Sequence, residues 1–326
     1  MLNKPKFWSK PSFLSSLLLP LSHIYLLLYI CRKFFFKKRK VNIPIICVGN
    51  ITMGGAGKTP IAISLAKFLI SKGLNPHFLT RGYKGKLKGP VLVSKEHSSR
   101  DVGDEPILLS EIAPTWVSQN KQDGAILALE NNADLIIMDD GLQNDSLYKD
   151  LSILVIDGGF GFGNKKLIPA GPLRETPRRA SKKIDFIIFV NDPERNVKLD
   201  LSSFKCPILE SDIETILDDI DLNKNFSGFC GIGRPEKFFS SLKKSGIKLK
   251  FSRSFPDHHQ YSEDEIMKII EDANIEKSEV LTTKKDWVRL PENAKLMISY
   301  LDCRIKFHDL AKLQKNLNKI LEIKSD

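Results

Sequence analysis

Short apolar runs alternate with segments of helical spacing along most of the chain. We expect strands where β-rich apolar residues cluster, at residues 45–49, 77–80, 91–93, 134–138, 152–156 and 186–190. Between several of these runs the apolar residues recur at helical spacing, notably at residues 60–72 and 105–112. Strands that alternate with helices in this way predict an α/β fold, with a mostly parallel, doubly wound sheet covered on both faces.

A polar, irregular stretch at residues 191–203 separates this region from a second αβ pattern. There we expect strands at residues 226–232, 249–252, 280–282 and 296–300, and helices at residues 235–244, at residues 263–273 and from Leu310 onward. The sequence therefore predicts three parts: an N-terminal segment (1–40), a core domain (41–200) and a second, smaller α/β domain (201–326).

The first 40 residues differ from the rest in both hydrophobicity and charge. Residues 13–31 form a run of 19 residues without a formal charge, and residues 32–40 hold a basic cluster interleaved with three phenylalanines. This arrangement predicts an N-terminal membrane-associated helix, which either spans the bilayer or lies in its interface. The alternative is a buried core helix followed by a solvated basic turn. Apolar side chains recur at helical spacing at Leu14, Leu17, Leu18, Leu21, Ile24, Tyr25 and Leu28.

The composition excludes a wholly disordered chain and argues against nucleic-acid binding. Of 326 residues, 42% are hydrophobic and 27% are charged, as in ordinary globular proteins. The formal net charge is +11, but the first 40 residues hold nine basic residues and no acid, which leaves about +2 for the other 286. Since the body of the protein is nearly neutral, we expect no nucleic acid among its partners. The composition points to no particular protein partner.

Cysteine and histidine usage indicates a protein of a reducing compartment. The five cysteines lie far apart and form no CxxC pair, and the six histidines form no metal-binding motif. We therefore expect neither a disulfide framework nor a zinc site. Any metal ion is expected to be held by carboxylates.

The strongest chemical signal is the glycine-rich segment after the first predicted strand. Residues 52–59 read TMGGAGKT and lead into a predicted helix. Glycines let backbone N–H groups surround a phosphate, and the helix N-terminus adds its positive dipole end. This predicts a P-loop NTPase-like core, with Lys58 on the β- and γ-phosphates and Thr59 on Mg²⁺. The expected nucleotide-binding residues are Thr52, Met53, Gly54, Gly55, Ala56, Gly57, Lys58 and Thr59, although the usual GxxxxGK[ST] pattern has glycine in place of Thr52.

Acidic residues lie where a doubly wound sheet binds its ligands, at the carboxyl ends of the strands. Asp139 and Asp140 follow a buried strand, in the Walker B arrangement that holds Mg²⁺. Asp157 ends another strand, where a loop cap is favoured over a metal ligand. Asp104 and Glu105 precede a helix, and their position fits equally a helix cap or a base that orients an attacking hydroxyl.

Several other polar residues are candidates for the same edge of the sheet. One histidine of the pair His258 and His259 could pair with an acid to tune a base near neutral pH, although a structural role is commoner for such residues. Arg81 and Tyr83 follow a strand, and Arg174 lies in the segment LIPAGPLRE. Arginine is well suited to a substrate phosphate, but from spacing alone each arginine is a surface residue first.

Taken in order, these segments resemble one family closely. The motifs VGNITMGGAGKTP, TRGYKG, VGDEPILLS, DDGLQN, LIPAGPLRE, GIGRPEKFF, DHHQY and LTTKKD are similar to those of the tetraacyldisaccharide 4'-kinases, the lipid A kinases of Gram-negative bacteria. The resemblance extends from the N-terminal segment to about Leu290. It implies a two-lobed kinase on the cytoplasmic face of the inner membrane. Such an enzyme transfers the γ-phosphate of ATP to the 4'-hydroxyl of an acylated glucosamine disaccharide 1-phosphate.

The resemblance also implies roles for single residues. By this comparison Asp104 is the catalytic acid, with His258 as its partner and His259 as the neighbouring alternative, and Lys58 belongs to the catalytic phosphate loop. Thr59, Asp139 and Asp140 match the metal site. Tyr83, Glu105 and Arg174 match motifs that border the acceptor lipid. One departure is Asn144, where the family usually has histidine, so we expect no titrating role at this position.

A membrane-associated P-loop GTPase or ATPase switch is the main alternative. It would also carry GGxGKT, and residues 283–286 (TKKD) are similar to the TKxD motif that reads guanine. Against a switch, the DxxG spacing is missing because position 138 is methionine. A non-enzymatic membrane adaptor is less well supported, because Lys58, Thr59 and the strand-end acids are all present.

Overall fold

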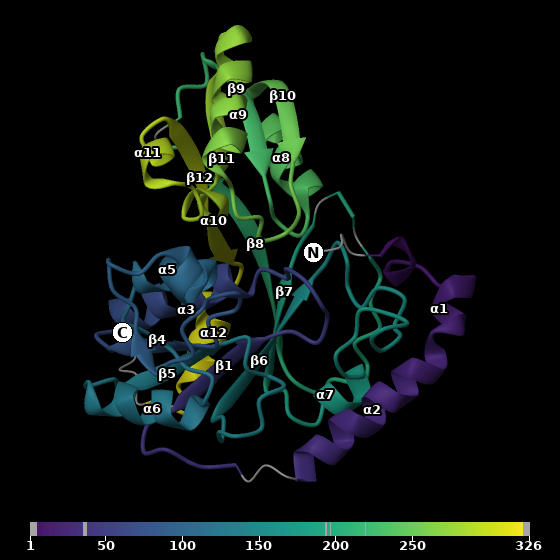
Figure 1. Cartoon of the computed structure of the whole chain (residues 1–326). Helices are drawn as coiled ribbons and strands as arrows, with labels where there is room; N and C mark the ends of the chain where they lie inside the picture. Colours follow the sequence, from purple (N-terminus) through teal and green to yellow (C-terminus); the bar gives the residue numbers. More distant parts are fainter. Residues whose placement is uncertain (1–4, 35–37, 193, 196, 219, 322–326) are drawn as a thin grey trace.

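A computed structural model describes residues 5–34, 38–192, 194–195, 197–218 and 220–321. One sheet of twelve strands, in the order β10-β9-β11-β12-β8-β7-β6-β1-β5-β2-β4-β3, passes through both lobes of the molecule (Figure 1). The strands are β1 (Ile45–Gly49), β2 (Pro76–Thr80), β3 (Val91–Leu92), β4 (Thr115–Val117), β5 (Leu135–Asp139), β6 (Leu151–Asp157), β7 (Phe186–Val190), β8 (Ile208–Ile216), β9 (Asn225–Cys230), β10 (Lys248–Ser254), β11 (Glu279–Thr283) and β12 (Ile298–Phe307).

The helices between these strands cover both faces of the sheet, as the alternating pattern predicts. They are α1 (Phe13–Leu17), α2 (Leu19–Phe34), α3 (Lys58–Ser71), α4 (Ser99–Val102), α5 (Asp104–Ser110), α6 (Lys121–Glu130), α7 (Pro177–Ala180), α8 (Pro235–Lys244), α9 (Glu263–Ile275), α10 (Lys284–Trp287), α11 (Glu292–Lys295) and α12 (Leu310–Leu317), with a short 3-10 helix at Lys6–Trp8.

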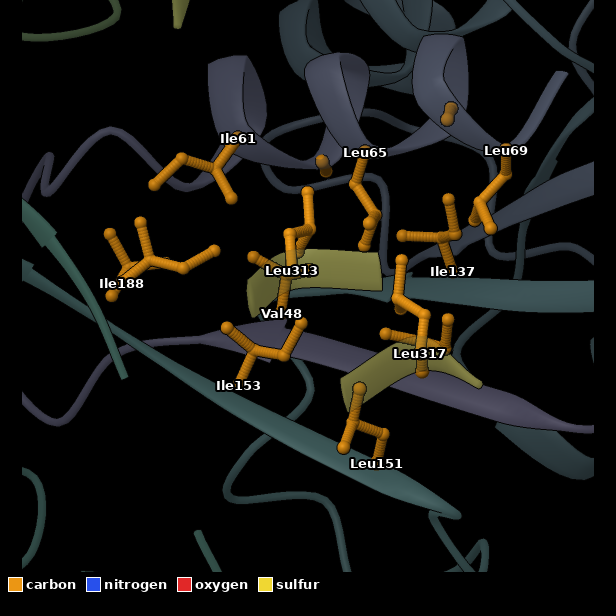
Figure 2. Packing of buried hydrophobic residues seen from close by; sticks show 14 of the residues in the cluster. Val48, Ile61, Leu65, Leu69, Ile137, Leu151, Ile153, Ile188, Leu313 and Leu317 are labelled. Atoms are coloured by element: carbon orange, nitrogen blue, oxygen red, sulfur yellow. The ribbon is translucent and has the colours of Figure 1, made fainter. Parts of the chain in front are cut away.

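The first lobe is built on parallel strands that are buried on both faces. β1 pairs in parallel with β5 and β6, and every residue of these three strands is buried. Figure 2 shows one face of the core, where Ile61, Leu65 and Leu69 of α3 pack over Val48 and Ile137 of the sheet. Burial on both faces explains the unbroken apolar runs of the sequence and confirms the predicted α/β sheet.

The second lobe is joined to the first by two long strands. β12 pairs antiparallel with β8 and parallel with β11, so this two-stranded ribbon carries the sheet from one lobe into the other. After β12 the chain returns to the first lobe, because Leu313 and Leu317 of α12 are fully buried in its core (Figure 2). The polar stretch after residue 190 connects β7 to β8, and the division into 1–40, 41–200 and 201–326 stays a prediction.

The N-terminal helices lie along the outside of the first lobe (Figure 1) and present polar groups to it. Ser22 Oγ donates a hydrogen bond to the carbonyl of Leu167 (2.8 Å), and Tyr25 OH donates to the carbonyl of Arg174 (2.9 Å). Apolar side chains on the other side of these helices are exposed, namely Phe13, Leu14, Leu17, Leu21, Ile24, Leu27 and Leu28. This exposure contradicts the alternative of a buried core helix. Among the described residues, no helix is both long and apolar enough to cross a bilayer.

Some elements are absent from the sequence-based prediction or differ from it. β8 was not predicted, because it is only partly buried and its partner β12 lies far along the chain, as the pairing of Ile213 with Ile305 shows. β12 extends to Phe307, well beyond the predicted strand at residues 296–300. β4 has three residues, too few for a recognisable pattern.

Candidate active site

The glycine-rich segment forms a tight turn between β1 and α3. Gly54 and Gly57 have φ values of 99° and 83°, in the left-handed region that glycine enters without a steric cost. Gly57 caps α3, so Lys58 and Thr59 form the first turn of that helix and are both buried. Thr52 stands where the common motif has glycine, but here the chain bridges to Leu173 as an extended segment, which suits any residue.

Thr59 and Asp139 lie together at the end of the sheet. Thr59 Oγ1 donates a hydrogen bond of 3.1 Å to Asp139 Oδ2, while Asp139 Oδ1 is buried and has no hydrogen-bond partner among the described residues. Burial, followed by the nearby charge of Glu105, raises the pKa of Asp139 to about 7. An orphaned carboxylate oxygen beside a hydroxyl fits Mg²⁺. Within the described ranges no three His, Cys, Asp or Glu side chains converge as a metal site, so phosphate and water oxygens would complete the coordination.

Asp140 faces cations from two different elements. The guanidinium of Arg174 approaches both of its oxygens, at 2.8 and 3.1 Å, and Lys58 Nζ lies 3.6 Å from Oδ2. Burial alone would raise the pKa of Asp140, but Lys58 and Arg174 outweigh burial and hold it below its usual value. The structure thus brings Arg174 to the acidic pair, rather than leaving it on the open surface.

Asp104 and His258 form a buried pair contributed by the two lobes. Asp104 begins α5, and its Oδ2 lies 2.8 Å from Nδ1 of His258, which lies in the loop after β10. The rings of Tyr83 and His258 pack in a T-shaped arrangement, with their centroids 5.4 Å apart. His259 turns away and contacts Glu265 at 3.0 Å. Of the two neighbouring histidines, therefore, His258 is the one that meets Asp104.

The surroundings of Asp104 keep its carboxyl group ionised. Burial raises its pKa, but Lys285, the hydrogen bond to His258 and the charge of Arg289 together hold the pKa of Asp104 well below its usual range. His258 has a φ of 58°, a left-handed conformation that non-glycine residues hold mainly where the surrounding structure imposes it, often at functional sites. A fixed carboxylate beside an imidazole can accept a proton from a hydroxyl.

A cleft of about 2830 Å³ between the lobes connects these groups. Its walls include Gly54, Lys58, Asp139, Arg174 and His258, together with the acidic side chain of Glu105 and the phenol of Tyr83. Most of the predicted site residues line this cleft, namely Met53, Gly54, Gly55, Ala56, Gly57, Lys58, Thr59, Tyr83, Glu105, Asp139, Asp140, Arg174 and His258. Asp104 lies behind His258, and Thr52 is set back against Leu173.

Asp157 and Asn144 make structural contacts that require neither a bound metal ion nor a side chain that changes its protonation state. Asp157 Oδ1 accepts a hydrogen bond from the Gly159 amide (3.0 Å), which is the predicted loop cap, and the same carboxylate pairs with Arg234 at 2.8 Å. Asn144 Oδ1 accepts from the amide and the hydroxyl of Ser146, at 3.0 and 2.8 Å. Asn144 thus fixes a turn at the rim of the cleft.

Lys121 is a cleft residue that the sequence analysis missed. It is the first residue of α6 and is only 5% exposed, and its Nζ has no hydrogen-bond partner in the part of the chain that the structure describes. Burial lowers its pKa to about 7. Since α6 follows the three-residue strand β4, no sequence pattern marked this position as the carboxyl end of a strand.

Comparison with known proteins identifies the family. The profile of the tetraacyldisaccharide-1-P 4'-kinase family matches residues 14–322. The chain belongs to this family. A tetraacyldisaccharide 4'-kinase of Paramagnetospirillum magneticum is 42% identical over 301 residues, which cover 91% of this chain and 92% of the relative. Its counterpart in Rhodospirillum rubrum is 39% identical over 310 residues, 94% of either chain.

A solved structure supports the same conclusion. The crystal structure of LpxK from Aquifex aeolicus in complex with ATP matches 94% of this chain and 99% of its own, with a TM-score of 0.78 and 30% sequence identity. These findings confirm the predicted family and the P-loop NTPase-like fold. Because the relatives are kinases, they also favour a kinase over the alternative of a P-loop switch.

Proposed function

We propose that the protein transfers the γ-phosphate of ATP to the 4'-hydroxyl of tetraacyldisaccharide 1-phosphate, which gives the bis-phosphorylated precursor of lipid A. The observation that carries this proposal is the convergence of a phosphate loop, a strand-end acid and an Asp–His pair on one cleft. Family membership supplies the identity of the acceptor.

The first lobe holds the phosphate donor. The backbone amides of residues 52–59 and the ammonium of Lys58 bind the phosphates of ATP, in the manner of other phosphate loops. Thr59, Asp139 and Asp140 are the residues that would hold Mg²⁺, and the ion would neutralise charge on the phosphate oxygens. Arg174, which contacts both oxygens of Asp140, keeps this carboxylate in place beside Lys58.

Asp104 acts as the base toward the acceptor, and His258 positions it. The carboxylate takes the proton of the 4'-hydroxyl, and the oxygen attacks the γ-phosphorus in line with the bond to ADP, which leaves with that bonding pair. Tyr83, Glu105 and Arg174 border the space for the sugar and its phosphate. Most of the rate then comes from positioning and charge neutralisation rather than from covalent chemistry.

The N-terminal helices hold the enzyme on the cytoplasmic face of the inner membrane. A lipid with four acyl chains leaves the bilayer only at a cost of roughly 0.8 kcal/mol per exposed CH₂, so the enzyme has to approach the surface. Leu21 and Leu28 are 51% and 65% exposed on the outer side of α2. We expect Leu21→Glu with Leu28→Glu to weaken co-sedimentation with anionic vesicles, whereas Leu296→Glu, at a residue 93% exposed on the second lobe, leaves it unchanged.

Transfer of label from γ-labelled ATP tests the reaction directly. Detergent-dispersed tetraacyldisaccharide 1-phosphate is the sole acceptor, and Lys58→Ala is the control. A labelled lipid bis-phosphate that depends on Mg²⁺ and on Lys58 would support the kinase. Release of free phosphate without a lipid product, especially from GTP, would instead indicate a switch and would refute the assignments around the acceptor.

A further inference from the structure

The motif LTTKKD contains two neighbouring lysines that point to different partners. Lys284 Nζ lies 2.7 Å from Glu111 and 2.9 Å from Asp302. Lys285 Nζ lies instead 3.3 Å from Glu105 Oε1, 3.4 Å from His258 Nε2 and 3.9 Å from Asp104 Oδ2. The second lysine of the motif therefore lies within the cluster that surrounds the proposed base.

The contact with His258 determines which ring nitrogen carries the proton. An ammonium group has three donors and no acceptor, so Nε2 of His258 has to accept from Lys285. In a neutral imidazole the other nitrogen, Nδ1, then bears the hydrogen and donates it to Asp104 Oδ2, at 2.8 Å. In this arrangement Asp104 is free of a proton of its own and is held from both lobes.

We propose that Lys285 is a positioning residue for phosphoryl transfer: its ammonium group fixes the Nδ1–H tautomer of His258 and keeps Asp104 as a carboxylate. This inference rests on the proposed function of the Asp104–His258 pair. It also gives LTTKKD a role in joining the lobes, because Asp104 and Glu105 belong to the first lobe while His258 and Lys285 belong to the second.

The charges around the cluster support this role. Burial favours the neutral amine, but Asp104 and Glu105 outweigh it and raise the pKa of Lys285 above its usual value. Lys285 is the leading charge among the groups that lower the pKa of Asp104. Titratable and charged groups that face the cluster from the packed elements are Tyr83, Lys84, Glu105, Asp257, His258 and Arg289.

The experiment compares pH profiles of lipid phosphorylation for Lys285→Met, Lys285→Arg and Lys284→Met. Loss of a cation about 4 Å from a carboxylate raises its pKa by roughly 1–3 units. We therefore expect the acidic limb of kcat/KM to move toward neutral pH by that amount in Lys285→Met. At pH 7 Asp104 is ionised in both enzymes, so the fall in kcat that we expect there, about tenfold, comes from loss of the His258 tautomer that positions Asp104. The KM for ATP should change little.

The two other variants serve as controls. Lys285→Arg keeps the charge, so its acidic limb should stay near that of the wild type. Lys284→Met removes a neighbouring lysine that pairs with Glu111 and Asp302, so its profile should match the wild type. An unmoved limb in Lys285→Met, or an equal movement in Lys284→Met, would overturn the inference. If the wild type transfers no phosphate to the lipid, the proposed function fails instead.

A measurement on the unaltered enzyme covers the case in which Lys285→Met does not fold. Nitrogen-15 NMR of labelled histidine distinguishes the two neutral tautomers, and His258→Gln identifies the His258 signal by its loss. We expect the Nδ1–H form at neutral pH. Observation of the Nε2–H form would contradict the hydrogen bond from Lys285 and refute the inference.

Discussion

Arg234 joins the two lobes through buried ion pairs, and its removal should destabilise the protein strongly. It lies in the second lobe before α8, and its guanidinium meets Asp157 at 2.8 Å and Asp192 at 3.0 Å in the first lobe. The side chain of Arg234 is 11% exposed, and those of the two acids are 8% and 3% exposed. Arg234→Ala would therefore leave two buried carboxylates with Lys237 as their remaining cation.

Removal of one partner from a buried ion pair costs about 3–5 kcal/mol, chiefly because the other charge stays buried. Lys237, at 3.2 and 3.4 Å from the two acids, keeps the expected loss near the lower end of that range. A matched control is Arg253, which pairs with Asp272 at 2.8 Å but is 38% exposed. An exposed pair contributes about 0–1 kcal/mol, so Arg253→Ala should have little effect.

Urea unfolding of the two variants and the wild type measures the free energies. Small-angle X-ray scattering of the same samples reports whether the lobes part, and we expect a larger radius of gyration for Arg234→Ala alone. Equal losses of stability in the two variants would show that the ion pairs between the lobes contribute no more than a surface pair, and would refute the reasoning.

Three further predictions test separate parts of the molecule. Asp104→Asn should lower kcat by about 10²–10⁴, the usual contribution of a general base, while the Kd for ATP from isothermal titration stays unchanged because Asp104 does not touch the phosphate loop. Leu313→Ala should cost about 2–5 kcal/mol in urea unfolding, because this side chain is fully buried; the same change at Leu310, which is 53% exposed, should cost far less. Lys121→Met should raise the melting temperature at pH 7, and the gain should shrink toward pH 10. The pKa of Lys121 is about 7 in the folded protein, against a usual value of 10.5 in the unfolded chain. Between these two pH values the unfolded chain binds the proton more strongly, so the wild type becomes more stable as pH rises and the advantage of methionine shrinks.

Local patterns predicted those parts of the fold that depend on neighbours in the sequence. The phosphate loop, the buried strand before it and the amphipathic start of α3 lie within one short segment, so spacing alone identified them. The ribbon of β8 and β12 depends on pairing between distant segments, and its half-exposed residues lack a continuous apolar run. Sequence spacing could therefore not locate the connection between the lobes.

The candidate site shows the same limit. Acids at strand ends could be named from the sequence, but their partners come from elsewhere in the chain: Arg174 meets Asp140, and His258 meets Asp104. Lys121 carries no signal of its own, since a lysine at the surface of a helix looks the same in sequence as one that lies in a cleft. Lys285 lies in a recognisable motif, but spacing does not tell which of its two lysines contacts the Asp104–His258 pair. Their roles depend on tertiary contacts.

The ribbon of β8 and β12 joins two lobes that share the candidate site, and this division affects how well ATP is protected from hydrolysis. Water competes with the lipid for the γ-phosphate, and it reaches any cleft that stands open. Because Asp104 belongs to one lobe and His258 and Lys285 to the other, the proposed base has these partners only when the lobes are together. On the proposed mechanism, ATP bound to the first lobe alone would therefore lose little of its γ-phosphate to water.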